Sequence, residues 1–180
     1  MFAPVILYGS PVLRKSSADI TEKDNVPGFS ETLFSTLKNA KGIGLAGTQV
    51  NILKRVFVID TSPLSEDDIT IEKYEKVFIN PVILERNNED VMFREGCLSI
   101  PDIFEEVKRP YKIWVRYNDP SFNVVEEEMT DIVARIFQHE YDHLEGILFI
   151  DKINPVKRKI LSPKLNKIKK LSRSSVNYYG

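Results

Sequence analysis

Both histidines of the chain lie within residues 138–143, four residues apart, and Glu140 directly follows the first. On an α-helix, positions i and i+4 share one face, so His139 and His143 could hold a single metal ion between them. A carboxylate beside such an ion can take a proton from an attacking water and hand it on. The stretch therefore predicts the centre of a metal-dependent hydrolase.

The flanking residues predict the helix that this spacing requires. Thr130 or Asp131 suits the N-cap, and Gly146 suits the position just past the C-terminal end. A helix with two ordinary polar histidines is the alternative, which the combination of histidines, glutamate and caps disfavours. We expect the ligands to continue a buried stripe. The residues of this stripe are Ile132, Ile136, His139 and His143.

A catalytic zinc-type site has three protein ligands and an open position, so a third ligand is needed. The metalloprotease pattern His-Glu-x-x-His-x-x-Gly-x-x-His is matched as far as Gly146, but its last position is Phe149. Another protease class uses a downstream glutamate, and none follows Glu145. The best remaining candidate is the lone cysteine, Cys97, although a single cysteine is more often an inert buried thiol.

Three ordered motifs resemble those of peptide deformylase, the enzyme family that removes the N-formyl group from newly made proteins. The first is residues 42–49, Gly-Ile-Gly-Leu-Ala-Gly-Thr-Gln, in which Gly47 stands where the family usually has alanine. The second is residues 95–99, Glu-Gly-Cys-Leu-Ser, and the third is residues 138–144, Gln-His-Glu-Tyr-Asp-His-Leu. The similarity extends from about residue 9 to residue 150.

The resemblance implies a metal centre and a general base that act on formyl-methionyl peptides. Cys97, His139 and His143 would hold one divalent metal, with Fe²⁺ the expected ion in the cell. A set of one cysteine and two histidines also accepts zinc, nickel or cobalt. Glu140 would take the proton of the attacking water and pass it to the leaving amine.

The glycine-rich first motif is a weak signal on its own, and it lacks the lysine of a phosphate loop. It suggests backbone exposed close to a ligand around Gly44, with Gln49 as a neutral hydrogen-bond donor. The resemblance implies that Gln49 and the backbone N–H of Leu98 donate to the developing oxyanion.

Other site residues are predicted with less direct support. Asp142 points away from the ligand face, and in the resembled family this aspartate pairs with an arginine at the position of Arg109. Either residue could instead be a solvated surface charge. An apolar slot for the methionine side chain is expected at Ile43, Phe93, Ile132 and Ile136.

Composition and patterning indicate a single α+β domain. The chain has 180 residues, of which 42% are hydrophobic, and strand patterns lie in its middle with helical patterns at its flanks. A first helix is expected at residues 27–40, with Gly42 just past its end. A polar surface excursion is expected at residues 61–76. Strands are expected at residues 54–60, at 77–80 and 82–84 on either side of Pro81, at 111–117 and at 122–125. The sheets, antiparallel or mixed, would surround the metal-binding helix.

The expected localisation is the cytoplasm. No apolar run approaches the length of a membrane span, and the first seven residues lack the basic start of a signal peptide. With one cysteine, no internal disulfide can form. Neither membrane nor DNA is expected as a partner.

The tail differs from the catalytic part, residues 1–151, and is treated as an extension of the same domain, residues 152–180. Nine lysines or arginines and no acid lie between Lys152 and Arg173, so residues 1–151 carry a net charge of −10 within the total of −1. A helical stripe is expected at Leu161, Leu165 and Ile168, with Pro163 limiting where that helix begins. The basic face would either lie in water or contact ribosomal RNA.

Two other functions stay open. A zinc endopeptidase shares the His-Glu-x-x-His chemistry, and a comparison of formylated with unformylated peptides would distinguish it. A catalytically idle relative, with a structural metal site or an RNA-binding tail, would bind metal but release no formate.

Overall fold

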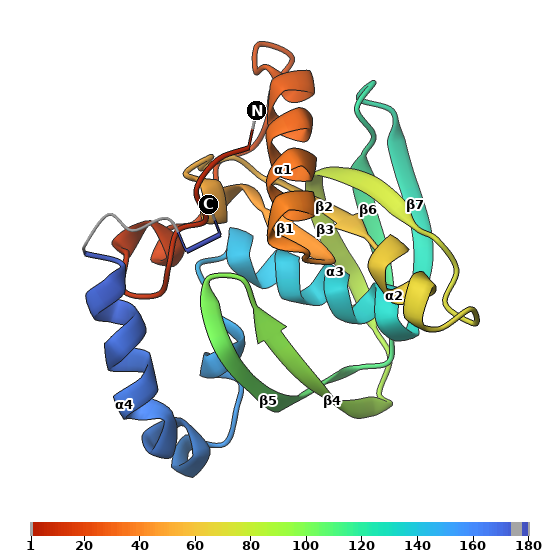
Figure 1. The fold of residues 1–180 in the computed structure, drawn as a ribbon. Coiled ribbons are helices and arrows are strands. Elements are labelled where there is room, and N and C mark those ends of the chain that lie inside the picture. Colours follow the sequence, from red (N-terminus) through yellow and green to blue (C-terminus); the bar gives the residue numbers. More distant parts are fainter. Residues whose placement is uncertain (1, 174–177, 180) are drawn as a thin grey trace.

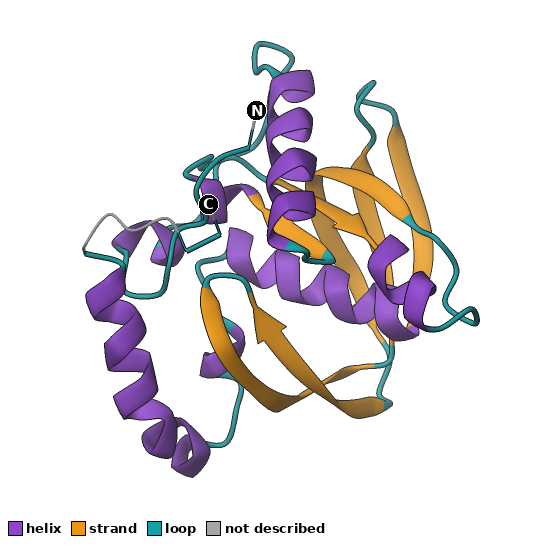
Figure 2. Cartoon of the chain, viewed as in Figure 1, coloured by secondary structure: helices purple, strands orange, loops and turns teal. Residues whose placement is uncertain are grey.

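The computed structural model describes residues 2–173 and 178–179. Two antiparallel sheets and four α-helices lie within these residues (Figures 1 and 2), which confirms the expected α+β fold. The larger sheet has the strand order β1 (Gly44–Ala46), β2 (Val56–Asp60), β3 (Glu75–Arg86), β6 (Lys112–Asn118) and β7 (Val124–Thr130). The smaller sheet is the hairpin of β4 (Asp90–Cys97) and β5 (Ile100–Pro110). The helices are α1 (Val26–Ala40), α2 (Ser62–Asp67), α3 (Asp131–Leu144) and α4 (Pro155–Leu171), and short 3₁₀ turns lie at Pro11–Arg14, Gly47–Val50 and Phe149–Asp151.

Helix α3 is the central element, lying between the five-stranded sheet and the β4–β5 hairpin (Figure 1). Its Phe137 is fully buried and meets Phe57 of β2 edge-on, with 5.0 Å between ring centroids. Phe78 of β3 completes the group, at 4.9 Å from Phe57 and 5.1 Å from Phe137. Aromatic burial of this kind fixes the height and rotation of α3 against the sheet.

The ends of α3 fall where the sequence predicts them. Thr130 occupies the N-cap position, although its side chain makes no capping hydrogen bond. At the other end Gly146 has a φ of 71°, and the N–H of Ile147 donates to the carbonyl of Asp142 at 2.9 Å. A side chain at Gly146 would also meet the carbonyl of Arg14, at 2.7 Å from the added Cβ. Only glycine satisfies both demands.

Helix α1 ends at Ala40, as expected, but the residue that terminates it differs from the glycine noted in the sequence. The left-handed residue is Lys41, with a φ of 53°, and not Gly42. Gly42 is instead a place of close approach, because a Cβ there would lie 2.7 Å from a methyl of Leu37 and 2.8 Å from a methyl of Leu98. Leu33 and Leu37 of α1 are buried in the core.

Pro81 does not break its strand, and the expectation of two segments is wrong. β3 runs from Glu75 to Arg86 with a register shift against β6 between Ile79 and Val82. Asn80 takes a φ of 48°, and its side chain bonds the N–H and the carbonyl of Ile20 at 2.7 and 2.9 Å. Proline removes one ladder hydrogen bond, and the strand accommodates the loss with a bulge.

Pro163 lies inside α4 and does not set its beginning, which corrects a second expectation. The helix begins at Pro155, where the side chain of Asn154 accepts from the N–H of Val156 at 2.8 Å. Leu165 and Ile168 are buried in a cluster with β5, as the stripe predicts. This packing, together with the cap, holds the helix through the proline.

Two features were not anticipated from the sequence. The β4–β5 hairpin was missed, and the polar excursion after β2 contains the short helix α2. No helix within the described part of the chain is long and apolar enough to cross a membrane.

Candidate active site

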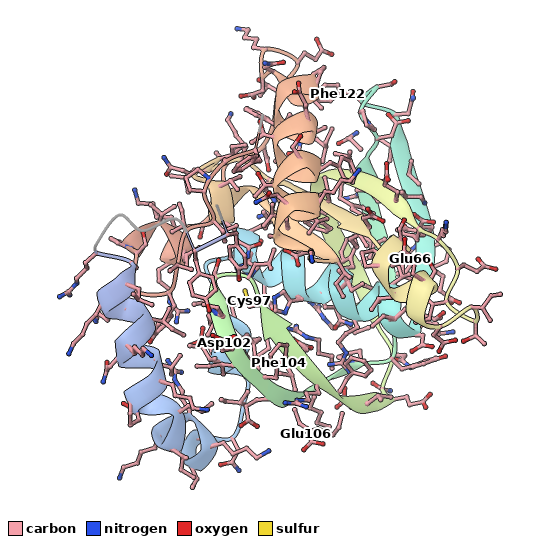
Figure 3. The ribbon with its side chains drawn as sticks, in the orientation of Figure 1. Glu66, Cys97, Asp102, Phe104, Glu106 and Phe122 are labelled. Carbon is pink, nitrogen blue, oxygen red and sulfur yellow. The ribbon has the colours of Figure 1, made fainter. Side chains whose placement is uncertain are left out.

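Three predicted metal ligands come together from two elements. His139 and His143 lie on consecutive turns of α3, and Cys97 is the last residue of β4, at the end of the hairpin beside α3 (Figure 3). Sγ of Cys97 lies 3.3 Å from Nε2 of His143. One ligand atom from each of the three residues falls within 4.8 Å of the others. The hairpin thus brings the cysteine to the histidine face of α3.

These donors fit a single transition-metal ion. The two histidine rings are 5.2 Å apart between centroids and inclined at 72°. Nδ1 of His139 lies 3.0 Å from a carboxylate oxygen of Glu95, so its Nε2 is left for the metal. One thiolate and two imidazoles suit zinc, iron, cobalt or nickel.

Glu140 is buried beside the ligands. Among the residues that the structure describes, no group donates a hydrogen bond to its Oε2. Burial raises the pKa of Glu140 to about 7, against the opposing charges of His139 and Arg109. Its other oxygen faces Gly44 of β1, where an added Cβ would lie only 2.5 Å from Oε1. A carboxylate with a spare oxygen and a pKa near neutrality can exchange protons during a reaction.

Gln49 is held in one orientation. The N–H of Ala46 donates to its Oε1 at 2.8 Å, so this atom must be the amide oxygen. The Nε2 group therefore points at Ser99, with Oγ at 3.1 Å, and at the sulfur of Cys97 at 3.6 Å. Leu98, the other predicted oxyanion donor, follows Cys97 in the turn between β4 and β5. Both donors thus lie next to the metal ligands.

The residues that fix His139 form a buried charge network. The guanidinium of Arg109 binds the Glu95 carboxylate through two hydrogen bonds of 2.6 and 3.0 Å. Arg135 of α3 donates to the same carboxylate at 3.0 Å. Burial alone would raise the pKa of Glu95, but hydrogen bonds from His139 and Arg109 outweigh it and hold the pKa well below its ordinary value.

The predicted contact between Arg109 and Asp142 is present, with 2.7 Å between Nη1 and Oδ2. Asp142 is also within 3.3 Å of Lys152 and lies away from the ligand atoms, in accord with a supporting position. Sequence reasoning missed Glu95 and Arg135. The available signal for Glu95 was its place in the same short motif as Cys97.

The four residues predicted to form the methionine slot lie in different surroundings. Ile136 is buried against Gly44, and Ile43 packs on the same core cluster. Phe93 and Ile132 instead line a cavity of only about 20 Å³ next to Arg135. Phe93 is 48% exposed. The slot itself stays a prediction.

The model of the polypeptide deformylase family matches residues 2–159. The chain belongs to this family. Peptide deformylase from Cytophaga hutchinsonii is 43% identical over 171 residues, covering 94% of this chain and 92% of the relative. Deformylase membership identifies the chain as an enzyme, and the grouping of Cys97 with the two histidines is consistent with one metal ion in a deformylase.

Solved deformylase structures share the whole fold. Peptide deformylase from Plasmodium falciparum superposes with a TM-score of 0.86 at 36% identity, covering 95% of this chain and 98% of that one. The deformylase from Thermus thermophilus gives a TM-score of 0.84 at 35% identity, with 95% and 99% covered.

Proposed function

We propose specific roles for the site residues in the reaction of this deformylase, the removal of the N-formyl group from newly made polypeptides. The observation that carries the proposal is the convergence of one sulfur and two nitrogen donors within 4.8 Å, with Glu140 buried beside them. A divalent metal bound there acts as a Lewis acid and makes water a stronger nucleophile at neutral pH.

Glu140 is the proton carrier in this proposal. It accepts a proton from the attacking water and releases it to the amine that leaves from the formyl carbon. Its burial and its pKa of about 7 support the role, because the group gains and loses a proton close to neutral pH.

Gln49 and the backbone N–H of Leu98 stabilise the negative charge that develops on the formyl oxygen. The bond from Ala46 fixes the Gln49 amide with its N–H groups toward Cys97, so no reorientation is needed as charge develops. Such fixed donors favour the transition state over the ground state. The absence of a side chain at Gly44 lets Glu140 lie directly against the backbone of β1.

Fe²⁺ is the proposed ion in the cell, as the resemblance to deformylases implies. The donor set is compatible with it, and equally with zinc, nickel or cobalt. Metal analysis of protein purified without oxygen tests this choice. A full complement of zinc with no iron would contradict it.

The basic tail is proposed to contact ribosomal RNA, which would place the enzyme in the cytoplasm beside its nascent substrates. Three of its cations already bind acids of the domain: Lys152 to Asp142, Lys157 to Glu105, and Arg158 to Asp151. The part of the chain that the structure describes provides no ion pair for the later cations. These are Lys159, Lys164, Lys167, Lys169, Lys170 and Arg173.

A charge-removal series tests the RNA contact while leaving the packed face of α4 intact. Exposed Lys164, Lys167 and Lys170 are changed to glutamine, which should weaken ribosome binding and flatten its dependence on salt. The matched control changes three exposed lysines elsewhere, Lys15, Lys23 and Lys38. Equal binding by both variants would refute the contact.

The reaction is tested by formate release from a formyl-methionyl peptide, with the unformylated peptide as control. The proposal expects formate and an otherwise intact peptide. Cleavage of internal peptide bonds would identify an endopeptidase. Metal binding without formate release would identify an idle relative.

A further inference from the structure

Two tyrosines near the end of the chain contact the β4–β5 hairpin. The hydroxyl of Tyr179 donates to the carbonyl of Leu98 at 2.7 Å, and the hydroxyl of Tyr178 donates to Asp102 at 2.7 Å. The two rings touch edge to face, 5.1 Å apart between centroids. In Figure 1 the C-terminal end lies near the turn of the β4–β5 hairpin, on which Figure 3 labels Cys97 and Asp102.

The turn to which Tyr179 bonds carries both a predicted ligand and a predicted donor. Cys97 ends β4, and Leu98 follows it. The pairing of β4 with β5 is irregular between Glu95 and Cys97, so the strand ladder alone does not fix the turn. Contacts from outside the hairpin must therefore help to position it. One of them joins the N–H of Tyr8 to the carbonyl of Ser99 at 2.7 Å.

Tyr179 also connects Leu98 to the end of α1. Its own carbonyl accepts a hydrogen bond from Nδ2 of Asn39, near the end of α1, at 2.6 Å. The Leu98 side chain packs on the core cluster of α1, so close to Gly42 that an added Cβ would lie 2.8 Å away. Helix α1 is thus linked to the carbonyl of Leu98 through Tyr179, and the Leu98 side chain packs on the cluster that includes Leu33 and Leu37 of α1.

The hydroxyl of Tyr179 stays a donor under physiological conditions. Burial of the half-buried side chain raises its pKa well above the ordinary value, and the nearby Cys97 adds to the effect. A neutral hydroxyl donating to a carbonyl contributes a modest but directional restraint.

We propose that Tyr179 is a positioning residue of the deformylase reaction, which holds the Cys97–Leu98 turn through the carbonyl of Leu98. It is neither a predicted metal ligand nor a predicted oxyanion donor. The inference rests on the proposed roles of Cys97 and Leu98. Its effect should fall on the transition state, because the Leu98 amide donates to charge that appears only there.

The test is Tyr179→Phe in the full chain, which removes the hydroxyl and keeps the ring. With full metal content, kcat on a formyl-methionyl peptide should fall about three- to tenfold while KM changes less than twofold. The control, Tyr178→Phe, removes a hydroxyl from the same segment that bonds Asp102 and should keep kcat within twofold. An unchanged kcat, an effect confined to KM, or equal losses in both variants would overturn the proposal. A rise in kcat/KM would also overturn it, since the segment would then be a barrier to substrate.

Amide hydrogen exchange gives a readout that does not depend on catalysis. A peptide spanning residues 97–99 should exchange faster in Tyr179→Phe than in the parent chain and in Tyr178→Phe. Identical exchange in all three would refute the restraint. If the parent chain released no formate, the proposed function would fail, while the exchange experiment would still decide the positioning role.

Discussion

Nδ1 of His139 lies 3.0 Å from Oε2 of Glu95, so a carboxylate on β4 sets the orientation of a predicted metal ligand on α3. The same strand ends in Cys97, a second predicted ligand, two residues after Glu95. Arg109 and Arg135 hold the carboxylate from β5 and α3. One buried network therefore joins β4, β5 and α3, and the predicted metal site depends on these three elements.

Glu95→Gln should weaken metal binding. The change removes the charge that orients His139 and balances two buried guanidiniums, and loss of such a support commonly costs 10- to 100-fold in metal affinity. Competition against a chelator measures the affinity. Glu106→Gln on the exposed side of the same hairpin is the matched control and should bind normally. Unaltered affinity in Glu95→Gln would show that the network does not support the ligand.

Glu140→Gln should retain bound metal but release formate far more slowly than the parent chain. The amide retains the shape of the side chain but cannot carry the proton, and removal of a general acid–base commonly costs on the order of 10²–10⁴ in rate. Formate release is measured together with metal content. Near-normal turnover at full occupancy would end the proposed role of Glu140.

Gly47→Ala introduces the residue that the family usually has at this position. The sequence alone therefore predicts that the fold tolerates the change. The structure predicts otherwise, because the added Cβ would lie 2.6 Å from the carbonyl oxygen of Ile52 and 3.2 Å from that of Lys54. Overpacking against backbone typically costs about 1–3 kcal/mol. Chemical denaturation should show this loss in the free energy of unfolding. A variant as stable as the parent would mean that the segment 52–54 moves aside without cost.

Asp151 should make stability depend on pH in the acid range. Burial opposes its ionisation, but hydrogen bonds from Arg14 and the N–H of Leu148 lower its pKa below the ordinary 3.8. A lowered pKa in the folded state stabilises the fold above the unfolded value, and the contribution is lost as pH falls through the folded pKa. The difference in unfolding free energy between the parent and Asp151→Asn should therefore be constant near neutral pH and shrink below about pH 4. A difference that is the same at every pH would contradict the assignment.

The sequence predicted best where structure is set locally. The spacing of His139 and His143, the glycine at position 146 and the stripe of α3 depend on helix geometry alone, and the structure contains all three. Glu95 was missed because its partners lie 14, 40 and 44 residues away, and no periodic pattern joins them.

Both prolines were misjudged for a related reason. Local rules make Pro81 and Pro163 breakers, but sheet pairing carries β3 past the first, and the burial of Leu165 and Ile168 carries α4 past the second. Tertiary contacts of this kind outweigh local propensity. The contact of Tyr179 with Leu98 spans 81 residues and is equally invisible to local patterns.

The central claim is that Cys97 is a thiolate ligand of the catalytic metal. Alkylation of this lone cysteine, measured by intact mass with and without a chelator, tests it most directly, with formate release followed on the same samples. The thiolate should be protected while metal is bound and should react once the metal is removed, in step with loss of activity. Equal labelling in both states would show that the sulfur does not touch the metal, and the three-ligand site would have to be abandoned.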